Sequence, residues 1–160
     1  MILSPGLIME MKQNPYKKLG ISLLLSFTVM YCVMYLNVED ASHIYVNLNR
    51  VYMALLMVSP MAIIMIGLMK DMYPNGRLNN IIMVLSALVF GLSLACLRTQ
   101  AFVSDAQYME GMIPHHSSAI MTSRNAALKD PRVKQLADSI IKSQNEEIDL
   151  MKSLIRDKEK

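Results

Sequence analysis

The sequence contains only two cysteines, Cys32 and Cys96, and each lies within a long apolar run. This pattern does not fit a disulfide framework, so we expect both to be small buried apolar residues. The chain also lacks a block of like charges with interleaved aromatic residues, although ten of its 16 lysines and arginines lie from Arg98 onward. We therefore expect no nucleic-acid partner and interpret these charges as solvent-exposed helix surface.

Enzyme signatures are missing as well. The sequence has no nucleophile–base arrangement, phosphate-binding loop or redox-cofactor motif, so we predict that the protein is not an enzyme and has no catalytic residue. Methionine, in contrast, is abundant, with 16 residues. Its thioether fills irregular gaps in protein cores and is also a soft ligand that selects Cu(I), so both interpretations stay open at this point.

Long uncharged runs are the clearest positive feature. Three of them approach the roughly 20 residues that a helix needs to cross a bilayer, and charged residues bracket each one. They predict membrane spans at about 19–36, 51–69 and 78–97. Lys17 and Lys18 precede the first run and Lys70 and Arg77 follow the second, so the positive-inside rule places the N-terminus in the cytoplasm.

The charge pattern divides the chain into three parts. We predict a cytoplasmic N-terminal segment (1–18), a membrane domain (19–98) and an extracytoplasmic helical hairpin (104–158). Within the membrane domain, small residues recur every four positions at Ala87, Gly91 and Ala95, which predicts a packing seam within the chain or between protomers. Methionines recur every fourth residue along the second span: Met53, Met57, Met61, Met65 and Met69.

The last third has the pattern of soluble amphipathic helices. Ser104 and Gln107 suit a capping box at the start of one helix, and Asp130 with Pro131 suits the start of a second helix with an apolar stripe. The chain is therefore predicted to be all-α, with three transmembrane helices followed by an αα-hairpin. Two helices bury little surface, so we expect the hairpin to pair with another copy as a four-helix bundle.

One face of the first hairpin helix carries metal-binding chemistry. At about 100° per residue, Met109, Met112 and His116 share a stripe, and a kink at Pro114 would turn His115 toward it. In an antiparallel hairpin that turns near Lys129, the second helix places an amide, a carboxylate and a thioether opposite: Gln144 level with His116, Glu147 with Met112, and Met151 with Met109.

These residues predict one shared metal site. Imidazole and thioether ligands suit copper, with Cu(I) favoured and Cu(II) possible, whereas calcium needs more oxygen ligands and zinc favours thiolates or more histidines. The candidate ligands are His115, His116, Met112, Met109, Met151, Glu147 and Gln144. The competing interpretation is structural, with the methionines as core filler and His116 hydrogen-bonded to Gln144.

The same segments resemble the bacterial DUF305 family. Met-Ile-Pro-His-His at 112–116 followed by Ala-Ile, together with the pattern over 130–151, is similar to its signature, and the resemblance covers about 104–155. It implies a ferritin-like fold outside the cytoplasm, and some members bind copper. Many members have Ala-Ile-x-Met, where this chain has Met121 and Thr122, so either position is a further candidate. No Glu-x-x-His occurs, so di-iron chemistry is not expected.

Three functional hypotheses follow. The first is a copper-binding protein anchored in a bacterial inner membrane, with metal ion, membrane lipid and a second copy as partners. The second is a transmembrane copper conduit that uses the methionine row of the second span. The third is an oligomerisation module without metal.

Overall fold

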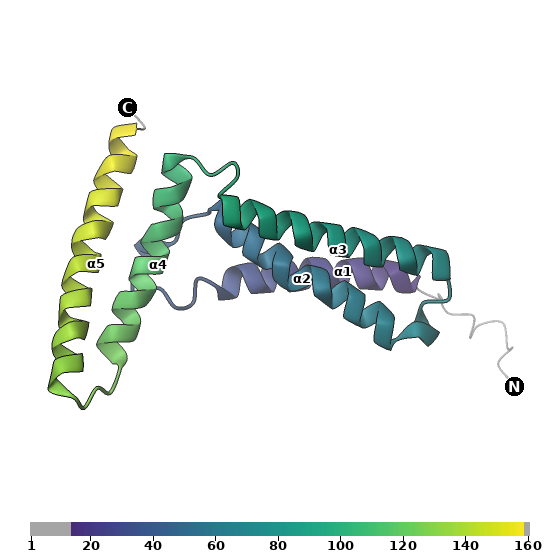
Figure 1. Cartoon of the computed structure of the whole chain (residues 1–160), viewed down its shortest axis with the longest axis horizontal. Helices are drawn as coiled ribbons and strands as arrows, with labels where there is room; N and C mark the ends of the chain where they lie inside the picture. Colours follow the sequence, from purple (N-terminus) through teal and green to yellow (C-terminus); the bar gives the residue numbers. More distant parts are fainter. Residues whose placement is uncertain (1–13, 159–160) are drawn as a thin grey trace, which may run out of the picture.

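The computed structural model describes residues 14–158, and this part of the chain is helical without strands. Its α-helices are α1 (Pro15–Val33), α2 (Leu48–Leu68), α3 (Gly76–Thr99), α4 (Asp105–Asn125) and α5 (Pro131–Lys158), with short 3-10 turns η2 (Ala41–His43) and η3 (Lys70–Met72). Helices α1–α3 form a bundle, and α4 and α5 lie side by side across one end of it (Figure 1). The predicted fold class is confirmed. Residues 1–13 of the predicted N-terminal segment lie outside the described part.

An asparagine begins each helix of the bundle. The side-chain oxygens of Asn14, Asn47 and Asn75 accept hydrogen bonds from backbone N–H groups in the first turns of α1, α2 and α3. Such a cap satisfies a backbone donor that the helix leaves free. The three helices therefore begin a few residues before the predicted spans, at polar residues rather than at the first apolar one.

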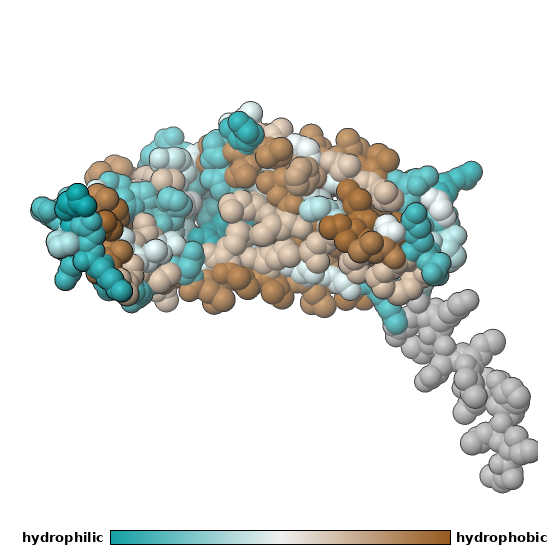
Figure 2. Space-filling model, turned by 60° about the horizontal axis from the view of Figure 1, so that its bottom comes forward, coloured by the Kyte–Doolittle hydropathy of each residue, from teal (hydrophilic) through white to brown (hydrophobic). Residues whose placement is uncertain are grey.

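Helices α1, α2 and α3 are each long and apolar enough to cross a membrane. Only 6%, 28% and 11% of their most apolar windows are buried by the protein itself, so most of this apolar surface needs another covering. Figure 2 shows it as a hydrophobic band over the bundle, with hydrophilic residues at the hairpin end. A lipid bilayer supplies that covering, and the predicted orientation across it stays a prediction.

Helix α2 is the centre of the bundle and packs against both α1 and α3. Its buried residues recur along one side: Ala54, Val58, Ser59, Ala62 and Ile66. The seam predicted in α3 is wrong for packing within the chain, because Ala87, Gly91 and Ala95 are exposed and the space around Gly91 is open. Close approach instead uses the small residues of α2. The expectation of buried cysteines also fails, since Cys32 is exposed and Cys96 is half-buried.

The hairpin has an apolar core between α4 and α5. It is formed by Met109, Ile113, Ile120, Ile148 and Ile155. Both predicted cap residues act as caps: Ser104 Oγ accepts from Gln107 N–H at 3.4 Å, and Asp130 Oδ1 accepts from Arg132 N–H at 2.8 Å. The predicted capping box is incomplete, because the Gln107 side chain accepts from Leu48 N–H and donates to Glu110 instead. Helix α5 packs on one side of α4, whereas α2 and η2 contact α4 from the membrane domain. Helix α4 is therefore the middle layer of the structure.

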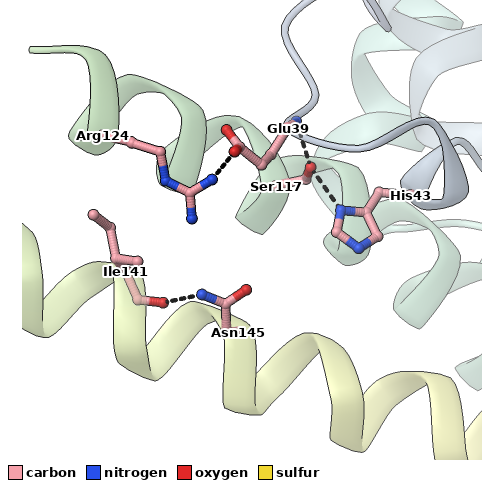
Figure 3. A network of polar contacts seen from close by, with 6 residues as sticks. All are labelled: Glu39, His43, Ser117, Arg124, Ile141 and Asn145. Atoms are coloured by element: carbon pink, nitrogen blue, oxygen red, sulfur yellow. Dashed lines mark hydrogen bonds and ion pairs between the residues drawn. The ribbon is translucent and has the colours of Figure 1, made fainter.

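The connection between α1 and α2 holds α4 in place. Ser117 Oγ, which is fully buried, accepts from Glu39 N–H at 2.8 Å and shares a hydrogen bond of 2.8 Å with His43 Nδ1. Arg124 forms an ion pair with Glu39. Figure 3 shows Ser117 between Glu39 and His43, and Arg124 pointing toward the carboxylate of Glu39. The hairpin is thus attached to the membrane domain by polar contacts as well as by the chain.

Candidate metal centre

The two adjacent histidines of α4 lie on different faces of the helix. His116 is buried, with the α5-facing residues Met109, Ile113 and Ile120 on its side, whereas His115 is exposed and lines a cavity on the membrane-domain side. Their ring centroids are 5.9 Å apart and the rings are tilted by 68°. Helix α4 runs continuously through Pro114, so His115 keeps the orientation of an ordinary helix rather than the predicted turn toward α5.

Both ring nitrogens of His116 have partners within the hairpin. Nε2 lies 2.6 Å from Glu147 Oε2 and Nδ1 lies 2.9 Å from the carbonyl oxygen of Met112. These partners, a side-chain carboxyl group and a backbone carbonyl, both offer acceptor oxygens to the ring. Hydrogen bonds from the Ser143 hydroxyl and from His116 lower the pKa of Glu147, which favours its charged form. A metal at His116 would have to replace one of these contacts.

The partner of His116 is Glu147, one turn beyond the predicted Gln144. Residues 126–129 are not helical, and α5 begins at Pro131, after Asp130. The hairpin therefore does not follow a count of equal residues from Lys129, and Glu147 rather than Gln144 reaches His116. Gln144 is half-buried.

Met109 and Met151 lie in the apolar part of the hairpin. Met109 belongs to the buried core, Met151 packs against it, and both line an apolar groove with Leu150 and Leu154. This placement agrees with the core-filler interpretation. The seven candidate ligands therefore do not share one cavity, and among residues 14–158 no three His, Cys, Asp or Glu side chains cluster as a metal site.

The remaining candidates, Met112 and His115, open into a cavity of about 640 Å³ at the junction with the membrane domain. Three further methionines line it: Met34 at the end of α1, Met53 in α2 and Met121 in α4. Of the two positions left open in the sequence, Met121 is thus at the cavity, whereas Thr122 is exposed beside another groove. Met34 and Met53 are predicted only as residues of the membrane spans. Met34 is near the end of the first predicted span and Met53 near the beginning of the second, so the prediction already places both on the same side of the membrane.

The cavity is positively charged at one side. None of the described residues that line it is Asp, Glu or Lys, and Arg50 contributes a positive charge to its wall. The guanidinium lies 3.9 Å from the centre of the Tyr35 ring and donates to the carbonyl oxygen of Met34. The lining residue Asn49 has a buried side-chain oxygen without a hydrogen-bond partner among the described residues. Neutral soft donors beside one cation fit a soft, singly charged metal ion and do not suit hard divalent ions.

Comparison with known proteins extends these observations. The family model described as "Domain of unknown function (DUF305)" matches residues 92–155, from the end of α3 through most of α5. "Uncharacterized protein L153" of Acanthamoeba polyphaga mimivirus is 41% identical over 133 residues, which are 81% of this chain and 86% of that protein. No solved structure matches. A similarity of that length reaches beyond the hairpin into the membrane helices, and the chain belongs to the DUF305 family.

Proposed function

We propose that the protein is a membrane-anchored copper-binding protein whose ligands include His115 and Met112. The observation that carries the proposal is the junction cavity, where an imidazole and several thioethers line one space, with no carboxylate among the lining residues that the structure describes. In the predicted orientation this cavity faces the outside of the cell, where the protein would buffer, sense or hand on copper. A bacterial inner membrane stays the predicted location.

The ligand chemistry supports Cu(I) over other biological metals. Thioether and imidazole are soft or borderline donors, and they bind Cu(I) or Ag(I) better than they bind calcium, magnesium or manganese. A metal-bound imidazole nitrogen must be free of its proton, so acid is expected to weaken binding. His115 is accessible and His116 is held by Glu147 and Met112, which favours His115 as the ligand.

The test is Cu(I) binding by the full chain in detergent, measured by competition with a chromophoric chelator. We expect a His115→Ala, Met112→Leu double variant to lose affinity and a Met151→Leu control to keep it, since Met151 lines the apolar groove and not the cavity. Elemental analysis of protein purified without added metal gives an independent reading. No Cu(I) or Ag(I) binding by the unchanged protein would refute the proposal.

Self-association is the second candidate function. Helix α5 carries large apolar side chains that are 44–59% exposed: Val133, Leu136, Leu150 and Leu154. A second hairpin packed on them would complete the predicted four-helix bundle. Dimers that persist unchanged in strong chelator, with no metal bound, would favour this function alone.

The conduit hypothesis requires additional chains. Met53, Met57 and Met69 are exposed on the bundle, and Met65 packs at the end of the bundle away from the hairpin. A single chain therefore leaves much of the methionine row of α2 open to lipid, and only packing between protomers would enclose it.

A further inference from the structure

We infer that the metal site is shared between the two halves of the protein, with Met34 and Met53 of the membrane domain completing the ligand set of His115 and Met112. This inference rests on the proposed copper function and names residues for it outside the hairpin. It also assigns the site to a singly charged soft ion.

The hairpin alone leaves a metal ion at this position half-enclosed. Met112 and His115 lie three residues apart on α4 and contribute donors from one side of the cavity. The opposite wall is formed by the end of α1 and the beginning of α2, where Met34 and Met53 are placed. A soft ion in this space is thus offered thioethers from both walls.

The membrane-domain wall is held in position before any metal binds. Arg50 donates to the carbonyl oxygen of Met34 and lies over the Tyr35 ring, which ties the end of α1 to the first turn of α2. The Tyr35 hydroxyl donates in turn to the Tyr45 carbonyl at 2.6 Å. Met53 is one turn after Arg50 and remains 44% exposed, so its thioether is not buried in the core of the bundle and is accessible to a ligand.

The charge of Arg50 sets the preference among metals. Its repulsion toward a divalent ion is twice that toward a monovalent ion at the same place, and no described Asp or Glu lines the cavity to offset it. Zn(II) and Cu(II) are therefore disfavoured relative to Cu(I) and Ag(I). A metal ion bridging the two walls would also clamp α4 onto the membrane domain.

A matched pair of variants tests the shared site in the full chain. The test variant is Met34→Leu, Met53→Leu, and the control is Met30→Leu, Met57→Leu, which makes the same change on the same helices one turn away from the cavity. Each is titrated with Cu(I), Ag(I) and Zn(II), and X-ray absorption counts the sulfur neighbours of bound copper. Circular dichroism checks that both variants keep their helices.

Removal of a residue that only supports a ligand typically weakens metal binding by roughly tenfold or more, so the test variant should lose at least about that much Cu(I) affinity. Its bound copper should also have fewer sulfur neighbours, while the control variant changes little. Equal Cu(I) affinities and sulfur counts in the two variants would overturn the shared site, although His115-dependent binding would preserve the proposed function. Tighter binding of Zn(II) than of Cu(I) would overturn the charge argument. Absence of Cu(I) and Ag(I) binding in the unchanged chain would refute both proposals.

Discussion

His115 and His116 are neighbours in the chain, but one is exposed at the junction cavity and the other is buried against α5. The inward ring is hydrogen-bonded to Glu147 and Met112, whereas the outward ring lines the same cavity as two thioethers of the membrane domain. One step of about 100° along a helix therefore separates a structural histidine from a candidate ligand. A paired motif such as His-His does not by itself mean that both rings serve one site.

The largest expected loss of stability comes from a substitution on the face of α4 that packs against α5. Ile113→Ala removes a fully buried side chain from the hairpin core and should cost about 2–5 kcal/mol of unfolding free energy. Leu136→Ala, at a position 59% exposed on α5, should stay within about 0.5 kcal/mol. Denaturant unfolding followed by circular dichroism measures both. Equal losses would indicate that the exposed face of α5 is buried in solution, as in a dimer.

A smaller loss is expected for the inward histidine. His116→Ala deletes two hydrogen bonds from a buried ring, which together should destabilise the hairpin by about 1–3 kcal/mol. Its Cu(I) affinity should fall less than that of His115→Ala, because the His116 ring faces α5. A variant with unchanged stability but abolished metal binding would reverse the roles assigned to the two histidines.

Acid should loosen the loop that holds α4. Burial, followed by the charge of Lys152, lowers the pKa of His43 below 6.5, although nearby carboxylates oppose this: Asp40, Asp149 and Glu39. A lowered folded pKa means that His43 stabilises docking fully above pH 6.5, and that this contribution is lost as pH falls through the folded value. Hydrogen exchange at the amides of residues 39–43, corrected for intrinsic rates, should therefore show less protection at pH 5 than at pH 8.

His43→Asn is the control for this pH effect, because it keeps a polar side chain that does not titrate. Protection in that variant should depend less on pH. A pH dependence as steep as in the unchanged protein would assign the effect to another group.

The smallest stability effect is expected for the outward histidine. His115 is exposed, so His115→Ala should change the unfolding free energy by no more than about 0.5 kcal/mol while it weakens Cu(I) binding. Thermal unfolding and metal titration of the same preparation separate the two effects. A large loss of stability without metal would mean that His115 is needed for packing.

Sequence patterns predicted the helices well for identifiable reasons. Charge-free runs of about 20 residues, with charged residues at each end, leave few alternatives to a membrane span. Ser104 and Asp130 are strong cap residues, and both cap as predicted. The site is harder to predict, because the hairpin pattern indicates only α5 as a partner of α4, whereas α4 also contacts α2 and η2. Met112, predicted to face α5, is half-buried and lines the cavity on the membrane-domain side of α4.

Other contributors had weak signals. His43 is one of three histidines and lies beside Glu39 and Asp40, but nothing in the loop sequence indicates that it docks on Ser117. In the sequence Arg50 is one of the charges that flank the second span, and its contact with Tyr35 depends on how α1 and α2 meet. Such contacts follow from tertiary packing, which no local period in the sequence reports.

The most direct test of the account is nitrogen NMR of the two histidine rings in the full chain during titration with Ag(I), a diamagnetic substitute for Cu(I). We expect a ring nitrogen of His115 to shift strongly up to one equivalent while both His116 nitrogens keep their positions. A shift of His116 with an unchanged His115 would contradict the assignment of the metal to the junction cavity.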